Sequence, residues 1–140
     1  MGFNRAMVSP DGHIPQPMRS GAGMLANFLP KVFAAEADAT LTVSEVAGGM
    51  IFQGTTLTSD VVYTLPTATL LQAANGFDAM DIGDAFSFVV VNSQVGAFDV
   101  VIAVGAGMTA IGANNTLSVA PQTSRIFTLI KTGTNTFDLY

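Results

Sequence analysis

Short apolar runs alternate with turn residues along the body of the chain, in a pattern typical of β structure. In 85–92 the residues Phe86, Phe88 and Val90 share one face of a predicted strand. The segment Ser93–Gly96 separates this strand from the next and predicts a hairpin. Further strands are predicted at 50–53, 61–65, 98–104, 117–119, 125–131 and 136–140, with the last turn at 132–135. Many short strands with turn signals roughly every 8–12 residues predict an all-β fold, a β-sandwich or jelly-roll-like body.

Two short helices are predicted within this β pattern. Thr42-Val43-Ser44-Glu45 has the spacing of a capping box and predicts one helical turn over 43–47, with Gly48-Gly49 as its end. Thr67 is placed to cap a second helix over 68–74, closed by Asn75-Gly76.

Two of the predicted strands are apolar on both faces. These segments are Val89-Val90-Val91 and Val100-Val101-Ile102, the second in a strand where Phe98, Val100, Ile102 and Val104 share one face opposite Asp99. One face of each strand packs on the core, so we expect the other to meet a partner chain or a helix.

Proline content and charge divide the chain near residues 34–40. Four of the six prolines lie in the first 30 residues, and residues 1–33 hold three basic side chains against one acid. Residues 34–140 hold two basic side chains against nine acids. We therefore predict an extended N-terminal arm, residues 1–39, and a β body, residues 40–140. The arm is expected to lie on neighbouring subunits, with wrapping around its own body as the alternative. Its predicted contact residues are Phe3, Arg5, Met7, Ile14, Arg19, Met24, Leu25, Phe28 and Leu29.

Composition excludes several classes of function. Only 11% of residues are charged, the net charge is -5 and mean hydropathy is +0.48, so clustered basic residues for nucleic-acid binding are absent. There is no cysteine, which excludes disulfides and thiolate metal sites. No apolar run approaches the ~20 residues of a membrane span.

Candidate catalytic and metal-binding residues are few. His13, the one histidine, lies in a turn-like part of the arm, where a catalytic base would lack a fixed partner. Asp78, Asp81 and Asp84 could offer oxygen ligands to Ca²⁺, but their spacing differs from a calcium-binding loop and a solvated acidic turn is expected. Gly105-Ala106-Gly107 lacks the rest of a nucleotide-binding motif and is interpreted as a turn. We expect no enzyme activity, no cofactor and no bound metal.

Several body segments resemble small capsid cement, or decoration, proteins of tailed bacteriophages. The segments are Leu41–Ile51, Tyr63–Ala68, Ile82–Phe88 and Val90–Asn92, within a resemblance that covers most of 40–140. It implies a β-sandwich body, usually trimeric, seated on the outside of the head where capsomers meet, with an arm running between subunits. It implies no catalytic residues.

The resemblance and the residue pattern give one expectation of function. The chain would be a structural virion protein that stabilises a phage head by binding across capsomer boundaries, through its arm and its apolar body faces. Its partners would be the major capsid protein and itself, as a homotrimer, on the outer surface of the virion after synthesis in the host cytoplasm. The alternative is a β-sandwich module associated with a tail fibre or with host recognition, binding a receptor or carbohydrate.

Overall fold

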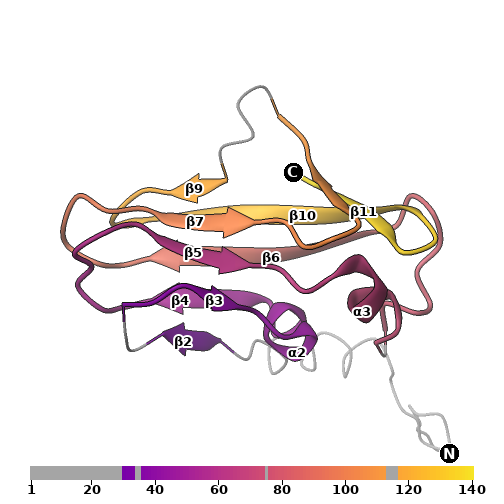
Figure 1. Ribbon diagram of the computed structural model, residues 1–140, viewed down its shortest axis with the longest axis horizontal. Coiled ribbons are helices and arrows are strands. Elements are labelled where there is room, and N and C mark those ends of the chain that lie inside the picture. Colours follow the sequence, from indigo (N-terminus) through magenta and orange to yellow (C-terminus); the bar gives the residue numbers. More distant parts are fainter. Residues whose placement is uncertain (1–29, 34–35, 75, 113–116) are drawn as a thin grey trace, which may run out of the picture.

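Ten strands and two short helices make up the described part of the chain (Figure 1). The structure, a computed structural model, describes residues 30–33, 36–74, 76–112 and 117–140. The strands form two mixed sheets, one of six strands and one of four, so the fold is mainly β as predicted. Neither helix in these residues is long and apolar enough to cross a membrane.

The six-stranded sheet combines parallel and antiparallel pairs. Strands β2, β4 and β6 are parallel neighbours, β10 is antiparallel to both β6 and β11, and β8 pairs parallel to β11. In spatial order the strands are β2 (Lys31–Phe33), β4 (Met50–Gln53), β6 (Ala85–Asn92), β10 (Thr123–Gly133), β11 (Thr136–Leu139) and β8 (Met108–Ala110).

The four-stranded sheet has a similar arrangement. Strands β3, β5 and β7 run parallel, and β9 closes the sheet antiparallel to β7. In order the strands are β3 (Ala39–Thr40), β5 (Val61–Thr64), β7 (Val100–Ala103) and β9 (Ser118–Val119). Five of the eight strand pairings in the two sheets are parallel. The structure does not confirm a jelly-roll connectivity, because jelly rolls are built from antiparallel Greek keys.

Successive strands from β2 to β10 alternate between the two sheets, and this makes the hairpin prediction wrong. Ser93–Gly96 joins β6 to β7, which lie in different sheets. The buried side chain of Asn92 donates from Nδ2 to the carbonyl oxygens of Phe98 (3.1 Å) and Val119 (2.9 Å). Gln94, also buried, donates to the same Phe98 oxygen at 2.7 Å. These bonds hold the connection as an arch between the sheets.

Both predicted helices are confirmed, with their N-terminal caps, although Ala73 and not Asn75-Gly76 caps the end of the second. In α2 (Val43–Ala47) the Glu45 N–H donates to Thr42 Oγ1 at 3.3 Å, and the Thr42 N–H donates to the Glu45 carboxylate at 2.8 Å. In α3 (Ala68–Gln72) the Leu70 N–H donates to Thr67 Oγ1 at 3.2 Å. This helix is two residues shorter than predicted.

The core lies between the sheets and confirms the predicted strand faces. Phe88 and Val90 of β6 and Val100 and Ile102 of β7 are buried. Tyr63 of β5 is fully buried and stacks on Phe33 of β2, with ring centroids 4.0 Å apart. The other fully buried large apolar residues are Leu41, Ile51, Leu65, Leu71, Phe127, Leu129, Phe137 and Leu139.

Of the predicted arm, residues 1–29 lie outside the described part of the chain. Lys31–Phe33 forms β2 at the edge of the six-stranded sheet, and Ala39–Thr40 forms β3 at the edge of the other. The sequence pattern assigns both segments to the arm because they are too short to show the alternation of a strand.

Candidate functional site: two apolar grooves

The contact residues predicted in the arm, Phe3 to Leu29, all lie outside the described residues, and so does His13. The candidate site is therefore built from the body. Two apolar hollows on its surface have no charged residue in their lining. We name them the sheet groove and the helix groove.

The sheet groove lies on the outer face of the six-stranded sheet and has a volume of about 320 Å³. Its lining is Gly49, Met50, Ser87, Phe88, Val89 and Ile126. The strand register sets Met50 of β4, Val89 of β6 and Ile126 of β10 side by side in one row. Ile126 is 68% exposed, at a point where β10 pairs with β6 and its pairing with β11 has not yet begun. At one end of the row the hydroxyls of Ser87 and Thr128 are 2.8 Å apart. An isoleucine this exposed on the face of a sheet, within an uncharged row, marks a surface that another apolar group can cover.

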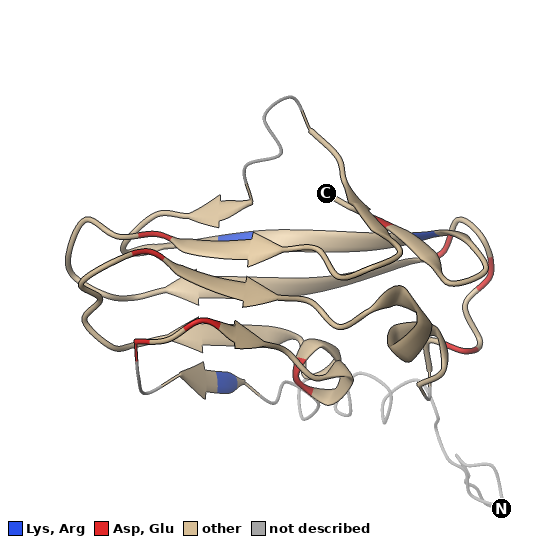
Figure 2. Cartoon of the chain, viewed as in Figure 1, with Lys and Arg blue, Asp and Glu red and all other residues tan. Residues whose placement is uncertain are grey.

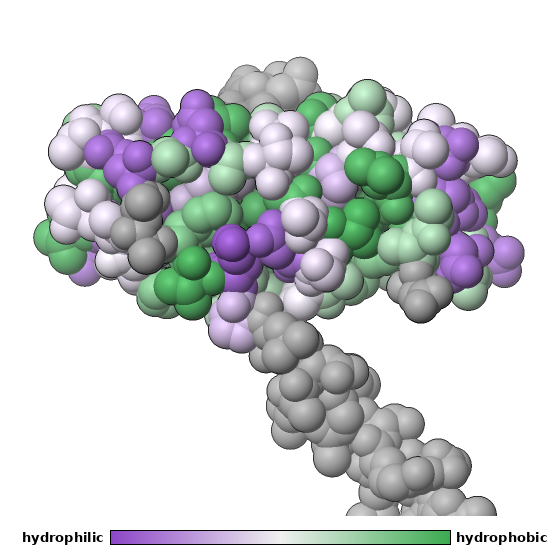
Figure 3. Space-filling model, turned by 60° about the horizontal axis from the view of Figure 1, so that its bottom comes forward, coloured by the Kyte–Doolittle hydropathy of each residue, from purple (hydrophilic) through white to green (hydrophobic). Residues whose placement is uncertain are grey.

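The helix groove lies between α2 and α3 and has a volume of about 490 Å³. Leu70 of α3, 60% exposed, stands at its rim. Figure 3, which brings the side of β2 and the helices forward, shows apolar side chains in patches among polar ones. The lining is Thr40, Leu41, Thr42, Val43, Thr64, Leu65, Pro66, Thr67, Leu70, Val104, Gly105 and Ala106.

Backbone bonds fix the floor of the helix groove. The Leu65 N–H donates to the Ala103 carbonyl and the Ala68 N–H to the Ala106 carbonyl, each at 2.8 Å. These bonds hold the segment that follows β5 against the segment that follows β7. Gly105 lies so close to that first segment that a Cβ there would be 2.6 Å from the Leu65 carbonyl oxygen and closer still to that of Pro66. The groove therefore has a preformed floor.

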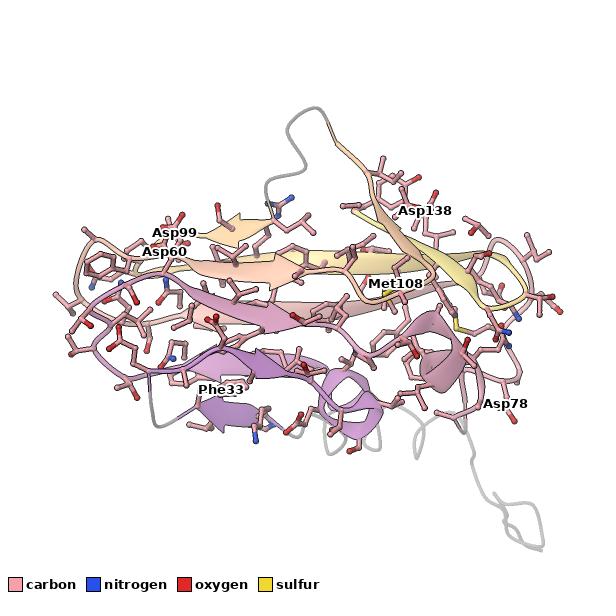
Figure 4. The ribbon with its side chains drawn as sticks, viewed as in Figure 1. Phe33, Asp60, Asp78, Asp99, Met108 and Asp138 are labelled. Carbon is pink, nitrogen blue, oxygen red and sulfur yellow. The ribbon has the colours of Figure 1, made fainter. Side chains whose placement is uncertain are left out.

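Charged side chains lie mostly at the ends of strands and in the loops (Figure 2). Several acids there accept backbone N–H bonds. Asp60 accepts the N–H of Asp99 at 2.8 Å, and the two residues lie together at one end of the molecule (Figure 4). Asp38 accepts the N–H of Val62 at 2.8 Å. These acids accept hydrogen bonds from backbone N–H groups near the ends of strands.

Glu36 is the most heavily bonded of these acids. Its carboxylate accepts bonds from the hydroxyl and the N–H of Thr58 and from the N–H of Ser59. The Thr58 hydroxyl, followed by these backbone bonds, lowers the pKa of Glu36 below its usual value. The segment after β2 is thereby tied to the loop before β5.

Lys31 and Glu45 form an ion pair beside the start of β2, with Nζ and Oε1 2.8 Å apart. Partial burial alone would raise the pKa of Glu45, but the bonds from Lys31 and Thr42 outweigh it and lower that pKa. The pair joins β2 to α2.

The acidic residues Asp78, Asp81 and Asp84 bond to local backbone. Asp78 accepts the N–H of Gly76 at 3.1 Å, and Asp84 accepts the N–H of Asp81 at 2.8 Å. Within the described ranges, no group of three or more His, Asp or Glu side chains is arranged to hold a metal ion.

The buried polar side chains Gln53 and Tyr63 are hydrogen-bonded within the core. Gln53 Nε2 donates to the Tyr63 hydroxyl at 2.7 Å, and Gln53 Oε1 accepts the Thr55 N–H at 2.7 Å. Burial raises the pKa of Tyr63 to about 12, so this hydroxyl stays neutral and joins the two sheets. The described residues thus offer binding surfaces more clearly than reactive groups.

Of the two grooves, the sequence predicted only the sheet groove, and only in part. The two-sided apolar run Val89-Val90-Val91 indicated a second apolar face, and Val89 of that face lines the sheet groove. The helix groove was missed because its lining comes from segments up to 66 residues apart, from Thr40 to Ala106. Its one local signal is the pair Leu70-Leu71: adjacent positions on a helix point about 100° apart, and here Leu71 is buried while Leu70 is exposed.

Comparison of the chain with known proteins identified no relative. No protein-family model, no curated protein and no solved structure matches the chain. The function is therefore argued from the surfaces themselves.

Proposed function

We propose that the protein is a structural virion protein, a capsid cement protein that binds the outside of a tailed-phage head across capsomer boundaries. The observation that carries the proposal is the uncharged helix groove with Leu70 exposed at its rim. Such a groove on a small acidic chain suits an apolar side chain of another protein. The proposal includes an extended N-terminal arm, a structural relationship to cement proteins and a role without catalysis.

The proposed mechanism is the burial of apolar area between subunits. Removing apolar surface from water contributes about 25 cal/mol per Å², so a modest patch supplies several kcal/mol. Repeating the contact around a shell, and through a homotrimer, multiplies the gain by avidity. In this proposal the helix groove and the N-terminal arm contact the major capsid protein.

The test is co-sedimentation of the purified full chain with capsid shells that lack it. We expect binding at a fixed ratio to the capsid protein. Leu70→Glu should weaken it at least tenfold, since burying a leucine is worth about 1.5–3 kcal/mol and about 1.4 kcal/mol is a factor of ten. Ile82→Glu is the matched control, because Ile82 is 71% exposed and lies outside both grooves.

Two further results decide the proposal. Deleting residues 1–23 should abolish binding while leaving the body folded, and retained affinity would refute the arm as an anchor. A full chain that forms a stable trimer and does not sediment with shells would refute the cement role. That result would favour the fibre-associated or host-recognition module instead.

A further inference from the structure

The sheet groove lies at the point where the described chain begins. Pro30 directly precedes β2, whose Lys31 pairs with Ile51 of β4. Because the two strands are parallel and in register, Pro30 lies beside Met50, which lines the groove. The chain upstream of Pro30 is therefore attached to the body beside this groove.

The upstream chain cannot simply continue β2 along β4. Pro30 has no N–H to donate, and Gly49, the next residue of the partner strand, has a φ of 85° and lies outside β4. The described pairing of β2 with β4 ends at this point, so the pairing does not set the direction of the chain upstream. One direction open to it is across the outer face, over the sheet groove.

The residues that precede Pro30 match the groove in chemistry and in reach. Met24-Leu25-Ala26-Asn27-Phe28-Leu29 carries no charge and a single polar side chain, and the groove lining carries no charge. From β2 to Ile126 in β10 is three strand spacings of about 4.8 Å, roughly 14 Å. Six residues of extended chain span up to roughly 20 Å, which is enough to cross all three.

We propose that the segment Met24–Leu29 of the same chain lies in the sheet groove and covers Met50, Val89 and Ile126. The covalent connection through Pro30 gives this segment a high effective concentration at the groove, which favours it over a segment of a second copy. Met24, Leu25, Phe28 and Leu29, predicted from the sequence as contacts to neighbouring subunits, would then contact their own body, and residues 1–23 would remain for the contact with shells proposed above. The inference goes beyond the cement role and does not require it.

A tryptophan reporter tests the proposal, because the chain has no tryptophan of its own. In Phe28→Trp we expect blue-shifted emission, since the indole would lie against Met50 and Val89. Adding Ile126→Glu should shift the emission toward that of the urea-unfolded chain, because a carboxylate would stand in the groove. Adding Ile82→Glu, equally exposed and outside the groove, should leave the emission unchanged.

Ile126→Glu is not expected to unfold the body, because the side chain it replaces is 68% exposed. Solvated emission in Phe28→Trp itself, or no response to Ile126→Glu, would overturn the proposal. So would a blue shift that disappears on dilution, because the occupant would then be a second copy.

A cysteine pair gives an independent measurement in this cysteine-free chain. Leu25→Cys with Ile126→Cys should oxidise to a disulfide within one chain, which requires Cα atoms within about 7 Å. Leu25→Cys with Ile82→Cys is the control that should stay reduced. Disulfides formed only between chains would refute the same-chain contact.

The docking and the cement role can fail separately, and the Phe28→Trp variant distinguishes the two failures. If this variant binds shells while its indole emission is that of a solvated tryptophan, the docking alone is refuted. If its emission is blue-shifted and it does not bind shells, the cement role alone is refuted.

Discussion

Gly105 forms part of the floor of the helix groove, and replacing it with alanine should be costly. The added Cβ would lie 2.6 Å from the carbonyl oxygen of Leu65 and 2.7 Å from the carbonyl carbon of Pro66. Both contacts are with backbone, and that backbone is held by the Leu65–Ala103 and Ala68–Ala106 hydrogen bonds. The strain therefore has no flexible side chain into which it can relax.

The expected loss of stability is large for a single methyl group. Overpacking typically costs about 1–3 kcal/mol, and an immovable neighbour places Gly105→Ala at about 3 kcal/mol. For a chain of this length that corresponds to a fall in Tm of roughly 10 °C. Urea unfolding followed by circular dichroism would measure it, with an unchanged m value indicating that the unfolded state is unaffected.

Gly54→Ala is the matched control. There the added Cβ would lie 2.8 Å from a ring carbon of Phe52, a side chain that can turn aside. The change should cost less than about 1 kcal/mol, because the alanine also reduces the entropy of the unfolded chain. If Gly105→Ala costs no more than Gly54→Ala, the floor of the groove is not rigid and the reasoning is wrong.

Three further predictions concern polar groups. Tyr63→Phe should cost about 1–3 kcal/mol in urea unfolding, because it leaves the buried Gln53 amide without an acceptor. Glu36→Gln should flatten the acid side of a plot of stability against pH. The lowered pKa of Glu36 stabilises the fold above its unfolded value of 4.5, and this contribution disappears as the pH falls through the folded pKa. Calcium should not raise the Tm of the protein, because Asp84 bonds to the Asp81 backbone; a rise abolished by Asp81→Asn with Asp84→Asn would show that a calcium site exists.

Local sequence signals located most elements but not their pairing. The capping box Thr42–Glu45 and the cap Thr67 predicted both helices, because capping depends on residues three positions apart. Strands β2, β3 and β8 have only two or three residues, too few to show an alternation. They are strands because a longer neighbour pairs with them, as Ile51 does with Lys31.

The connection at Ser93–Gly96 shows why pairing was harder to predict. Polar and glycine residues suit both a hairpin and an arch between sheets, and the choice depends on partners far along the chain. Val119, which accepts a bond from Asn92, is 27 residues away. The sheet groove is hard to predict for the same reason. Its residues Met50, Val89 and Ile126 lie far apart in the sequence and meet only when β4, β6 and β10 have paired.

The alternation of strands between the sheets also determines how the chain must fold. Met50 pairs with Val89 and Val61 with Val100, each 39 residues away, so the chain closes long loops before either sheet forms. Closing such a loop costs roughly 3 kcal/mol of chain entropy, and a high contact order of this kind slows folding. During synthesis at about 5–20 residues per second, β4 would lack its β6 partner for roughly 2–8 s. The chain therefore exposes apolar strands for seconds on the ribosome, an interval in which aggregation and chaperone binding compete with folding.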